Sequence, residues 1–184
     1  MTSTAASVPT LNGGRCVLRE LRVEDAASLA ANANNDAVWR NLFDGFPKPY
    51  TLGEAQCWCN PCTRPAAAGL VWGIAQNDEV IGCVGLRPDA GWLRCNAEVG
   101  YWIGEAHWRK GITCEALALV TAWAWAELPE VTRIYAPIFS WNLGSQSVAA
   151  KCGYTLEAHL PQSAIKDGQV INRVQYAVYR KLKV

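Results

Sequence analysis

A short basic turn, followed by a long apolar helix, holds the residues best suited to chemistry in this sequence. The turn reads Trp108-Arg109-Lys110-Gly111-Ile112-Thr113 and is followed by an apolar run that extends to about Leu128. The first turn of a helix has unpaired backbone N–H groups and the positive end of the helix dipole, so anions bind there. Gly111 lets a ligand approach the backbone, and Arg109 and Lys110 add positive charge. We therefore predict a phosphate site at this turn, although a basic helix start is also typical of a solvated surface.

Length and composition indicate one compact domain. The chain has 184 residues, 51 % of them apolar, which is large enough for a sizeable core. Residues 1–12 are small and polar, so we expect a flexible N-terminus there and a single domain over residues 13–184. The formal net charge of +1 is spread along the chain and gives no broad basic surface for nucleic acid or an anionic membrane.

We expect a cytoplasmic protein, because the sequence shows neither a secretion signal nor a membrane-spanning segment. The N-terminus has neither the charged nor the apolar region of a secretion signal. The longest apolar run, Ala116–Ala126, is too short to span a bilayer. Without a secretion signal, the eight cysteines are expected as reduced thiols.

The hydrophobic periodicity predicts the order strand, two helices, three strands, helix, strand, helix and two strands. The predicted strands are residues 15–21, 70–75, 79–86, 96–103, 133–138, 154–160 and 170–182, and the helices begin near Glu24, Thr51, Gly111 and Asn142. Asn77-Asp78 and Asp167-Gly168 are predicted hairpin turns. This order lacks the regular alternation of a doubly wound fold, so we expect a mixed sheet with helices on its faces.

Two segments leave alternatives open. The aromatic segment 36–50 fits neither helix nor strand periodicity and forms either a wall of a substrate pocket or a satellite of the core. Cys57, Cys59 and Cys62 lie close together in CWCNPC, which suggests zinc. A structural zinc site needs four ligands, however, and no second Cys/His pair follows at the required spacing. We therefore expect core or incidental thiols and no metal, with a small zinc protein as the alternative.

A second stretch connects the sequence to a family. Residues Asn142 to Tyr154 read Asn-x-x-Ser-x-x-Val-x-x-Lys-x-Gly-aromatic, which resembles the second signature of the GNAT superfamily of acetyl-CoA-dependent N-acetyltransferases. The basic turn is similar to that superfamily's pyrophosphate loop, Arg/Gln-x-x-Gly-x-Gly/Ala, and the predicted element order is similar to its fold. Glu98-Val99-Gly100-Tyr101-Trp102, together with Trp108 and Glu115-Ala116, resembles the RimJ/RimL branch. The resemblance covers about residues 14–182.

The resemblance implies a fold and a co-substrate. The fold would be the α/β GNAT fold, of the mixed α+β kind, with a central twisted mixed sheet of about seven strands and four helices on its faces. Acetyl-CoA would bind with its pyrophosphate on the backbone amides of Arg109–Cys114 and its pantetheine arm along Tyr101–Ile103, where Asn142 would donate a hydrogen bond to the arm. The implied cofactor-binding residues are Tyr101, Trp102, Ile103, Trp108, Arg109, Lys110, Gly111, Ile112, Thr113, Cys114, Asn142 and Ser145. Trp108 stands where many superfamily members have Arg or Gln, and Thr113 where Gly or Ala is usual.

The resemblance also implies the catalytic groups. Acetyl transfer to an amine needs a group that takes a proton from the amine and a group that protonates the departing thiolate. Glu98 lies in an otherwise apolar strand and matches the usual general base; its alternative is a carboxylate that faces solvent or pairs with Arg94. Ala149 replaces the tyrosine that often acts as the acid, so Ser145 is implied instead, with a hydroxyl satisfied by the helix backbone as its alternative.

Other residues are candidates for the site. His107 and His159 are further possible bases. An apolar acceptor pocket would draw on the tryptophans at positions 39, 58, 72, 102 and 141.

We therefore expect an N-acetyltransferase whose amine acceptor attacks acetyl-CoA directly in a ternary complex. By the branch resemblance, the acceptor would be a protein N-terminal α-amine; related sequences accept small-molecule amines. The alternative is a non-catalytic acetyl-CoA-binding or sensor module of the same fold. The chain would be a monomer or a homodimer, without nucleic acid or membrane as a partner.

Overall fold

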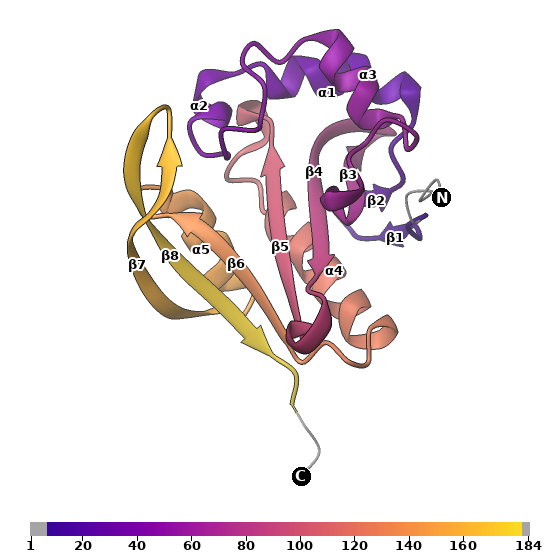
Figure 1. Cartoon of the computed structure of the whole chain (residues 1–184). Helices are drawn as coiled ribbons and strands as arrows, with labels where there is room; N and C mark the ends of the chain where they lie inside the picture. The colour runs from indigo at the N-terminus through magenta and orange to yellow at the C-terminus, as the bar shows by residue number, and fades with distance from the viewer. Residues whose placement is uncertain (1–6, 182–184) are drawn as a thin grey trace.

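One mixed sheet organises the molecule. The structure, a computed structural model, describes residues 7–181. Its eight strands lie in the order β1-β2-β3-β4-β5-β6-β8-β7 (Figure 1). The strands are β1 (Leu11–Asn12), β2 (Val17–Arg19), β3 (Leu70–Gln76), β4 (Glu79–Pro88), β5 (Asn96–Ile103), β6 (Arg133–Phe139), β7 (Thr155–Lys166) and β8 (Gln169–Tyr179). All neighbouring pairs are antiparallel except β5 and β6, which are parallel.

Five α-helices and four 3₁₀ turns surround this sheet. The helices are α1 (Ala26–Ala33), α2 (Asp36–Trp39), α3 (Leu52–Cys59), α4 (Ile112–Glu127) and α5 (Leu143–Lys151), and the 3₁₀ turns are η1 (Val23–Asp25), η2 (Ala66–Ala68), η3 (Gly91–Leu93) and η4 (Glu105–His107). The single mixed sheet with helices on its faces that the sequence predicts is confirmed. The two elements beyond the expected seven strands and four helices are β1 and α2, which have only two and four residues. No helix in the described range 7–181 is long and apolar enough to cross a membrane.

The core has two parts, one on each face of the sheet. Neighbouring residues of a strand point to opposite faces, and on β3 Trp72 joins one cluster while Val71 joins the other. The buried side of α4 packs into the first cluster, and α1 and α3 pack into the second. In Figure 1, α1 and α3 lie together at one end and α4 passes behind the sheet. The sheet is therefore covered on both faces, as the predicted mixed sheet with helices on its faces requires.

The N-terminal segment is more ordered than expected within the described range. Of the predicted flexible residues, 1–6 lie outside that range. Val8 is buried, the carbonyl of Pro9 accepts a hydrogen bond from Trp72 Nε1 at 2.9 Å, and β1 pairs with β2. These contacts attach residues 7–12 to the edge of the sheet.

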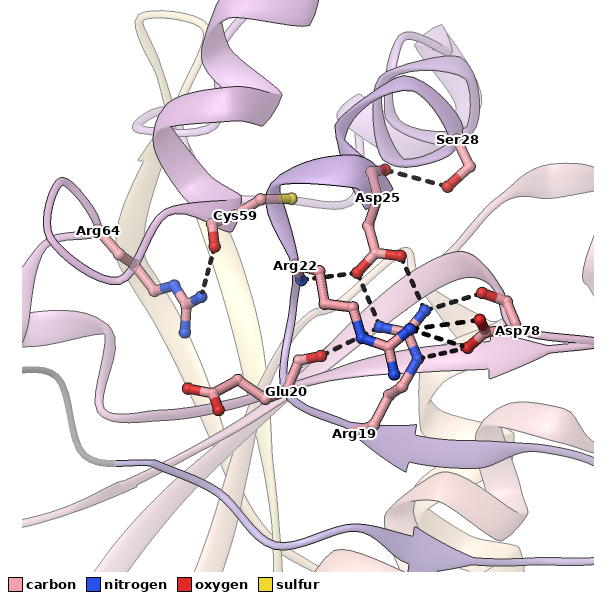
Figure 2. Close-up of polar contacts among 8 residues, drawn as sticks. All are labelled: Arg19, Glu20, Arg22, Asp25, Ser28, Cys59, Arg64 and Asp78. Atoms are coloured by element: carbon pink, nitrogen blue, oxygen red, sulfur yellow. Dashed lines mark hydrogen bonds and ion pairs between the residues drawn. The ribbon is translucent and has the colours of Figure 1, made fainter.

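A buried ion pair ties β2 to the start of α1. Two nitrogens of Arg19 donate to the two carboxylate oxygens of Asp25, both at 2.8 Å, and Arg19 also donates to Asp78 in the β3–β4 turn (Figure 2). Burial alone would raise the pKa of Asp25, but hydrogen bonds from Arg19 and from the backbone of Arg22 lower it. Arg19 therefore connects three elements, namely β2, the start of α1 and the β3–β4 turn.

Removing one partner of this pair should be costly. Asp25→Ala leaves the buried Arg19 charge with only the exposed Asp78 carboxylate as an ionic partner, so we expect the free energy of unfolding to fall by about 3 kcal/mol in urea titrations. Asp36→Ala is the matched control, because its ion pair with Lys48 is exposed; we expect it to cost less than about 1 kcal/mol.

The same variant has a predictable pH dependence. Because the folded-state pKa of Asp25 is lowered, its stabilisation is present above the unfolded carboxyl pKa of about 3.9 and is lost as the pH falls through the folded value. The stability gap between the parent and Asp25→Ala should therefore narrow in acid. A gap that stays constant from pH 7 down to pH 2 would contradict this assignment.

Candidate functional site

Two neighbouring strands separate near the centre of the sheet. β5 and β6 pair over only three residue pairs, of which the last is Glu98 with Tyr135. Beyond this point β5 continues along β4 as far as Ile103, and Figure 1 shows β5 and β6 diverging. On the side that faces β6, the backbone of residues 99–103 has no strand partner within the described chain. An extended ligand can pair with the N–H and C=O groups exposed there.

A cleft of about 700 Å³ opens where the strands separate. Its walls come from β4, β5, β6, the start of α5, the α2–α3 region and the β7–β8 hairpin. Five of the predicted site residues line it, namely Glu98, Tyr101, Trp102, Asn142 and Ser145. The structure thus brings together residues that lie on two separate motifs of the sequence.

The basic turn stands at the end of β5. Gly111 precedes α4 in the left-handed region with φ 76°, and Arg109 is also left-handed at φ 62°. Trp108 Nε1 donates to the carbonyl of Ile103 at 2.8 Å, which ties the turn to the end of the open strand. Trp108, Arg109, Lys110 and Gly111 are exposed. The turn is therefore accessible to a ligand that runs along β5.

The start of α4 suits a phosphate group. Ile112, the first helical residue, is buried in the core, whereas Thr113 and Cys114 are half-buried. No side chain in the described chain caps the helix at Gly111, so the first N–H groups of the helix have no intrahelical or side-chain acceptor. These donors suit a pyrophosphate, the group that the family resemblance implies at this turn.

Glu98 is held by an arginine on the next strand. Arg87 Nη2 donates to Glu98 Oε2 at 2.7 Å, and the two residues stand directly opposite each other in the β4–β5 register. The side chain of Glu98 is 30 % exposed and lines the cleft. Arg94, the alternative partner considered from the sequence, pairs with Glu130 instead. Arg87 could not be predicted from the sequence, because its pairing with Glu98 depends on the register of β4 and β5.

Ser145 and Tyr101 form a hydroxyl pair across the cleft. Ser145 Oγ donates to the Tyr101 hydroxyl at 3.1 Å, and that hydroxyl donates to the Ser145 carbonyl at 3.1 Å. Burial raises the pKa of Tyr101, although its hydrogen bond with Ser145 works in the opposite direction. Tyr101 therefore stays neutral near pH 7. The contact between the Tyr101 hydroxyl and Ser145 could not be predicted from the sequence, because the two residues are 44 positions apart.

Asn142 has a local role in addition to its place in the cleft. Its Oδ1 accepts the backbone N–H of Ser145 at 3.0 Å and so caps α5. This bond fixes the start of the helix and with it the position of Ser145. The amide nitrogen of Asn142 remains as the donor that could reach a ligand in the cleft.

The aromatic segment before α3 is one wall of the cleft. Leu42, Phe43, Phe46 and Tyr50 all line it. Phe46 stacks on Tyr50 with ring centres 4.7 Å apart and meets Trp102 edge-on at 5.6 Å. The structure thus favours the pocket-wall interpretation of segment 36–50, although Phe46 and Tyr50 are also buried core residues.

The predicted tryptophans divide between pocket and core. Trp58 and Trp102 line the cleft, whereas Trp39 and Trp141 do not. Trp72 is fully buried in the core, which excludes it as a pocket residue.

The candidate histidine bases lie elsewhere. Neither His107 nor His159 lines the cleft. Burial, together with the charge of Lys110, lowers the pKa of His107, and His159 is exposed on β7. Neither is placed to take a proton from a substrate in the cleft.

The cysteine cluster does not form a metal site in the described structure. Cys57 and Cys62 are exposed, Cys59 is buried, and all are free thiols. Across residues 7–181, no group of three or more His, Cys, Asp or Glu side chains is arranged to hold a metal ion.

Together, these features define an α/β protein that can hold an extended ligand along β5 with an anionic group at the start of α4. Comparison with known proteins agrees. The acetyltransferase (GNAT) domain family matches residues 15–155, and the chain belongs to this family. The expectation of an enzyme of the N-acetyltransferase class is thereby confirmed.

Individual proteins also resemble this chain in sequence or in structure. The uncharacterized N-acetyltransferase YoaA of Bacillus subtilis (strain 168) is 28 % identical over 176 residues, which cover 94 % of this chain and 97 % of YoaA. RimJ of Mycobacterium smegmatis, solved with CoA-disulfide, has a TM-score of 0.80 at 22 % identity, covering 93 % of this chain and 87 % of RimJ. RimL, the ribosomal L7/L12 alpha-N-protein acetyltransferase, solved with coenzyme A, has a TM-score of 0.78 at 19 % identity, covering 93 % and 98 %. These two structures support the resemblance to the RimJ/RimL branch at the level of fold.

The left-handed conformation of Gly111 makes a direct prediction. A β-branched side chain at φ 76° is strained, so Gly111→Val should lower the free energy of unfolding by about 1–3 kcal/mol. Gly53→Ala in α3 is the control, because an added Cβ there meets its nearest heavy atom at an ordinary 3.7 Å; it should be neutral or stabilising by up to about 1 kcal/mol. Equal effects of the two substitutions in urea unfolding would contradict the assigned backbone conformation.

Proposed function

We propose that this chain transfers the acetyl group of acetyl-CoA to a primary amine, which attacks the thioester directly while both substrates are bound. The observation that supports this most strongly is the meeting of two features at Ile103 and Trp108. The open strand of β5 ends there, and the uncapped start of α4 follows. One extended ligand with an anionic segment satisfies both features.

Acetyl-CoA matches these features part by part. Its pantetheine amides would pair with the backbone of Tyr101–Ile103, its pyrophosphate would accept hydrogen bonds from the first amides of α4, and Asn142 would donate to the pantetheine arm. The reacting thioester then lies in the cleft between Glu98 and Ser145, since both side chains line it. Bound there, acetyl-CoA supplies the activated acetyl group.

Glu98 is the group proposed to take a proton from the amine. Its Oε2 is engaged by Arg87, and Oε1 accepts the amine hydrogen directly or through a water molecule. As the nitrogen lone pair forms the new C–N bond, the C–S bond breaks, and the proton lost by nitrogen passes to Glu98. Arg87 keeps this carboxylate in a fixed orientation, so that little reorganisation is needed during the step.

Ser145 is the group proposed to assist the departing thiolate. Its hydroxyl is held by Tyr101, and it turns to donate a hydrogen bond to sulfur as negative charge develops there, so that coenzyme A leaves as a thiolate that solvent then protonates. Tyr101 acts as a positioning residue. Because burial raises the pKa of Tyr101, no second negative charge forms beside the thiolate.

The amine acceptor is proposed as a class of compound and not as a single molecule. The aromatic wall formed by Phe43, Phe46 and Trp102 suits an amine that carries an apolar group. Both a peptide N-terminus, as the name of RimL indicates for that protein, and a small-molecule amine meet this description. The cytoplasmic location and the monomeric or homodimeric state remain predictions.

Calorimetry followed by a turnover assay tests the proposal. Acetyl-CoA should bind the purified chain in the micromolar range and ATP should not, and a panel of peptides and small amines should then release free thiol. Binding without turnover on every amine would favour the non-catalytic module, and absence of acetyl-CoA binding would overturn the proposal.

Replacing Glu98 by glutamine should separate catalysis from binding. We expect kcat to fall roughly 10²- to 10⁴-fold while the affinity for acetyl-CoA changes little. Glu79→Gln, an exposed carboxylate on β4 outside the cleft, is the matched control. Unchanged turnover in Glu98→Gln would exclude Glu98 as the base.

The hydroxyl pair predicts non-additive kinetics. Ser145→Ala and Tyr101→Phe should each lower kcat roughly 10- to 100-fold, and the double variant should lose little more than Ser145→Ala alone, because Tyr101 acts through Ser145. Ser147→Ala, an exposed serine on the same helix, should match the parent enzyme. Fully additive losses would show that Tyr101 acts independently of Ser145.

A further inference from the structure

The segment before β2 is fastened to the first turn of α4 by one carboxylate. Glu115 accepts backbone N–H groups from Gly14 at 3.0 Å, Arg15 at 2.6 Å and Cys16 at 3.0 Å. Burial by itself would raise the pKa of Glu115, but these backbone donors lower it. The carboxylate is therefore ionised and satisfied mainly by backbone. The contact brings a segment from the far N-terminal end of the chain to the start of α4.

This contact places a cation beside the anion site. The Arg15 side chain is 61 % exposed and lies 3.7 Å from Glu115 Oε1, too long for a strong hydrogen bond. A Cβ built on Gly111 would lie 3.5 Å from Arg15 Nε. The guanidinium thus stands next to the residue where the uncapped helix begins, with most of its N–H donors free of strong partners in the described structure.

Arg15 differs from the two basic residues that the turn itself supplies. Arg109 and Lys110 are exposed side chains of the turn, and no ion pair within residues 7–181 holds either of them. The backbone of Arg15, in contrast, is fixed by its own hydrogen bond to Glu115. A cation whose backbone is already positioned loses less freedom when it binds a phosphate.

We propose that Arg15 binds the phosphate groups of CoA, with Glu115 as the positioning residue that holds the Gly13–Cys16 segment against α4. This inference rests on the proposed function, and it adds to that site a ligand-binding residue from outside both sequence motifs. The planar guanidinium donates two parallel hydrogen bonds to a phosphate, a geometry that lysine does not offer.

The first test is the affinity for acetyl-CoA. Arg15→Gln should raise Kd about 5- to 20-fold and reduce the salt dependence of binding, because one screened charge is removed. Arg94→Gln removes the same charge from an exposed arginine at the opposite end of β5 and should leave Kd unchanged. Thermal unfolding should be similar for both variants, since both side chains are exposed.

Shortened acyl donors identify the group that Arg15 contacts. With acetyl-pantetheine, which has no phosphate, Arg15→Gln should match the parent in kcat/KM. With 3′-dephospho-acetyl-CoA, a penalty that persists assigns Arg15 to the pyrophosphate, and one that disappears assigns it to the 3′-phosphate. A penalty that remains with acetyl-pantetheine would mean that Arg15 acts on the fold, and would overturn the inference.

Glu115→Gln tests the positioning role. If Glu115 acts through Arg15, the penalty of Arg15→Gln on acetyl-CoA binding should shrink in the Glu115→Gln background. A full penalty in that background would exclude the positioning role.

The two levels of the proposal fail separately. If the parent chain binds acetyl-CoA and Arg15→Gln binds it equally well, only the assignment of Arg15 is wrong. If the parent chain does not bind acetyl-CoA, the proposed function and this inference are both overturned.

Discussion

The short parallel pairing of β5 with β6 is the constraint on which the site depends. A parallel pair needs a crossover, and here the crossover is α4, which begins just after β5 ends and returns the chain to β6. The uncapped helix start therefore stands beside the strand end by topology alone. Because pairing stops at Glu98 and Tyr135, the strand that leads to this helix is left open on one side. A continuous β5–β6 ladder would close the cleft and remove the edge along which we propose that acetyl-CoA binds.

The remaining elements hold this opening in place from both sides. On one side, Asn142 caps α5 and brings Ser145 to Tyr101 on the open strand. On the other side, Glu115 binds the backbone before β2 and so connects the edge of the sheet to the start of α4. Each contact joins segments distant in the sequence through a polar group. The apolar core beneath α4 supplies the bulk of the burial, and these polar contacts determine which residues face the opening.

Much of the fold could be predicted from the sequence because its signals are local. Asn77 and Asp78 are both left-handed, as their residue types predict for a tight hairpin turn. Thr51 Oγ1 caps α3 by accepting the backbone N–H of Glu54. What could not be predicted depends on register and tertiary packing. The β4–β5 connection contains η3, and the register of the two strands places Arg87, not Arg94, opposite Glu98. Trp72 and Trp102 both lie on strands, yet only the packing of the sheet decides that one enters the core and the other the cleft.

Position 149 holds no tyrosine, but a tyrosine hydroxyl reaches the same region of the cleft from the opposite side. Ala149 is fully buried on the core side of α5, where a tyrosine ring would have to displace core side chains. The ring that does enter this region comes from β5, and its hydroxyl reaches Ser145 from the strand side. Under the proposed mechanism, the hydroxyl near the leaving group comes from α5 through Ser145 and is held by the strand through Tyr101. In this proposal, a hydroxyl pair stands in place of a single helix phenol, and the departing thiolate would meet a neutral donor.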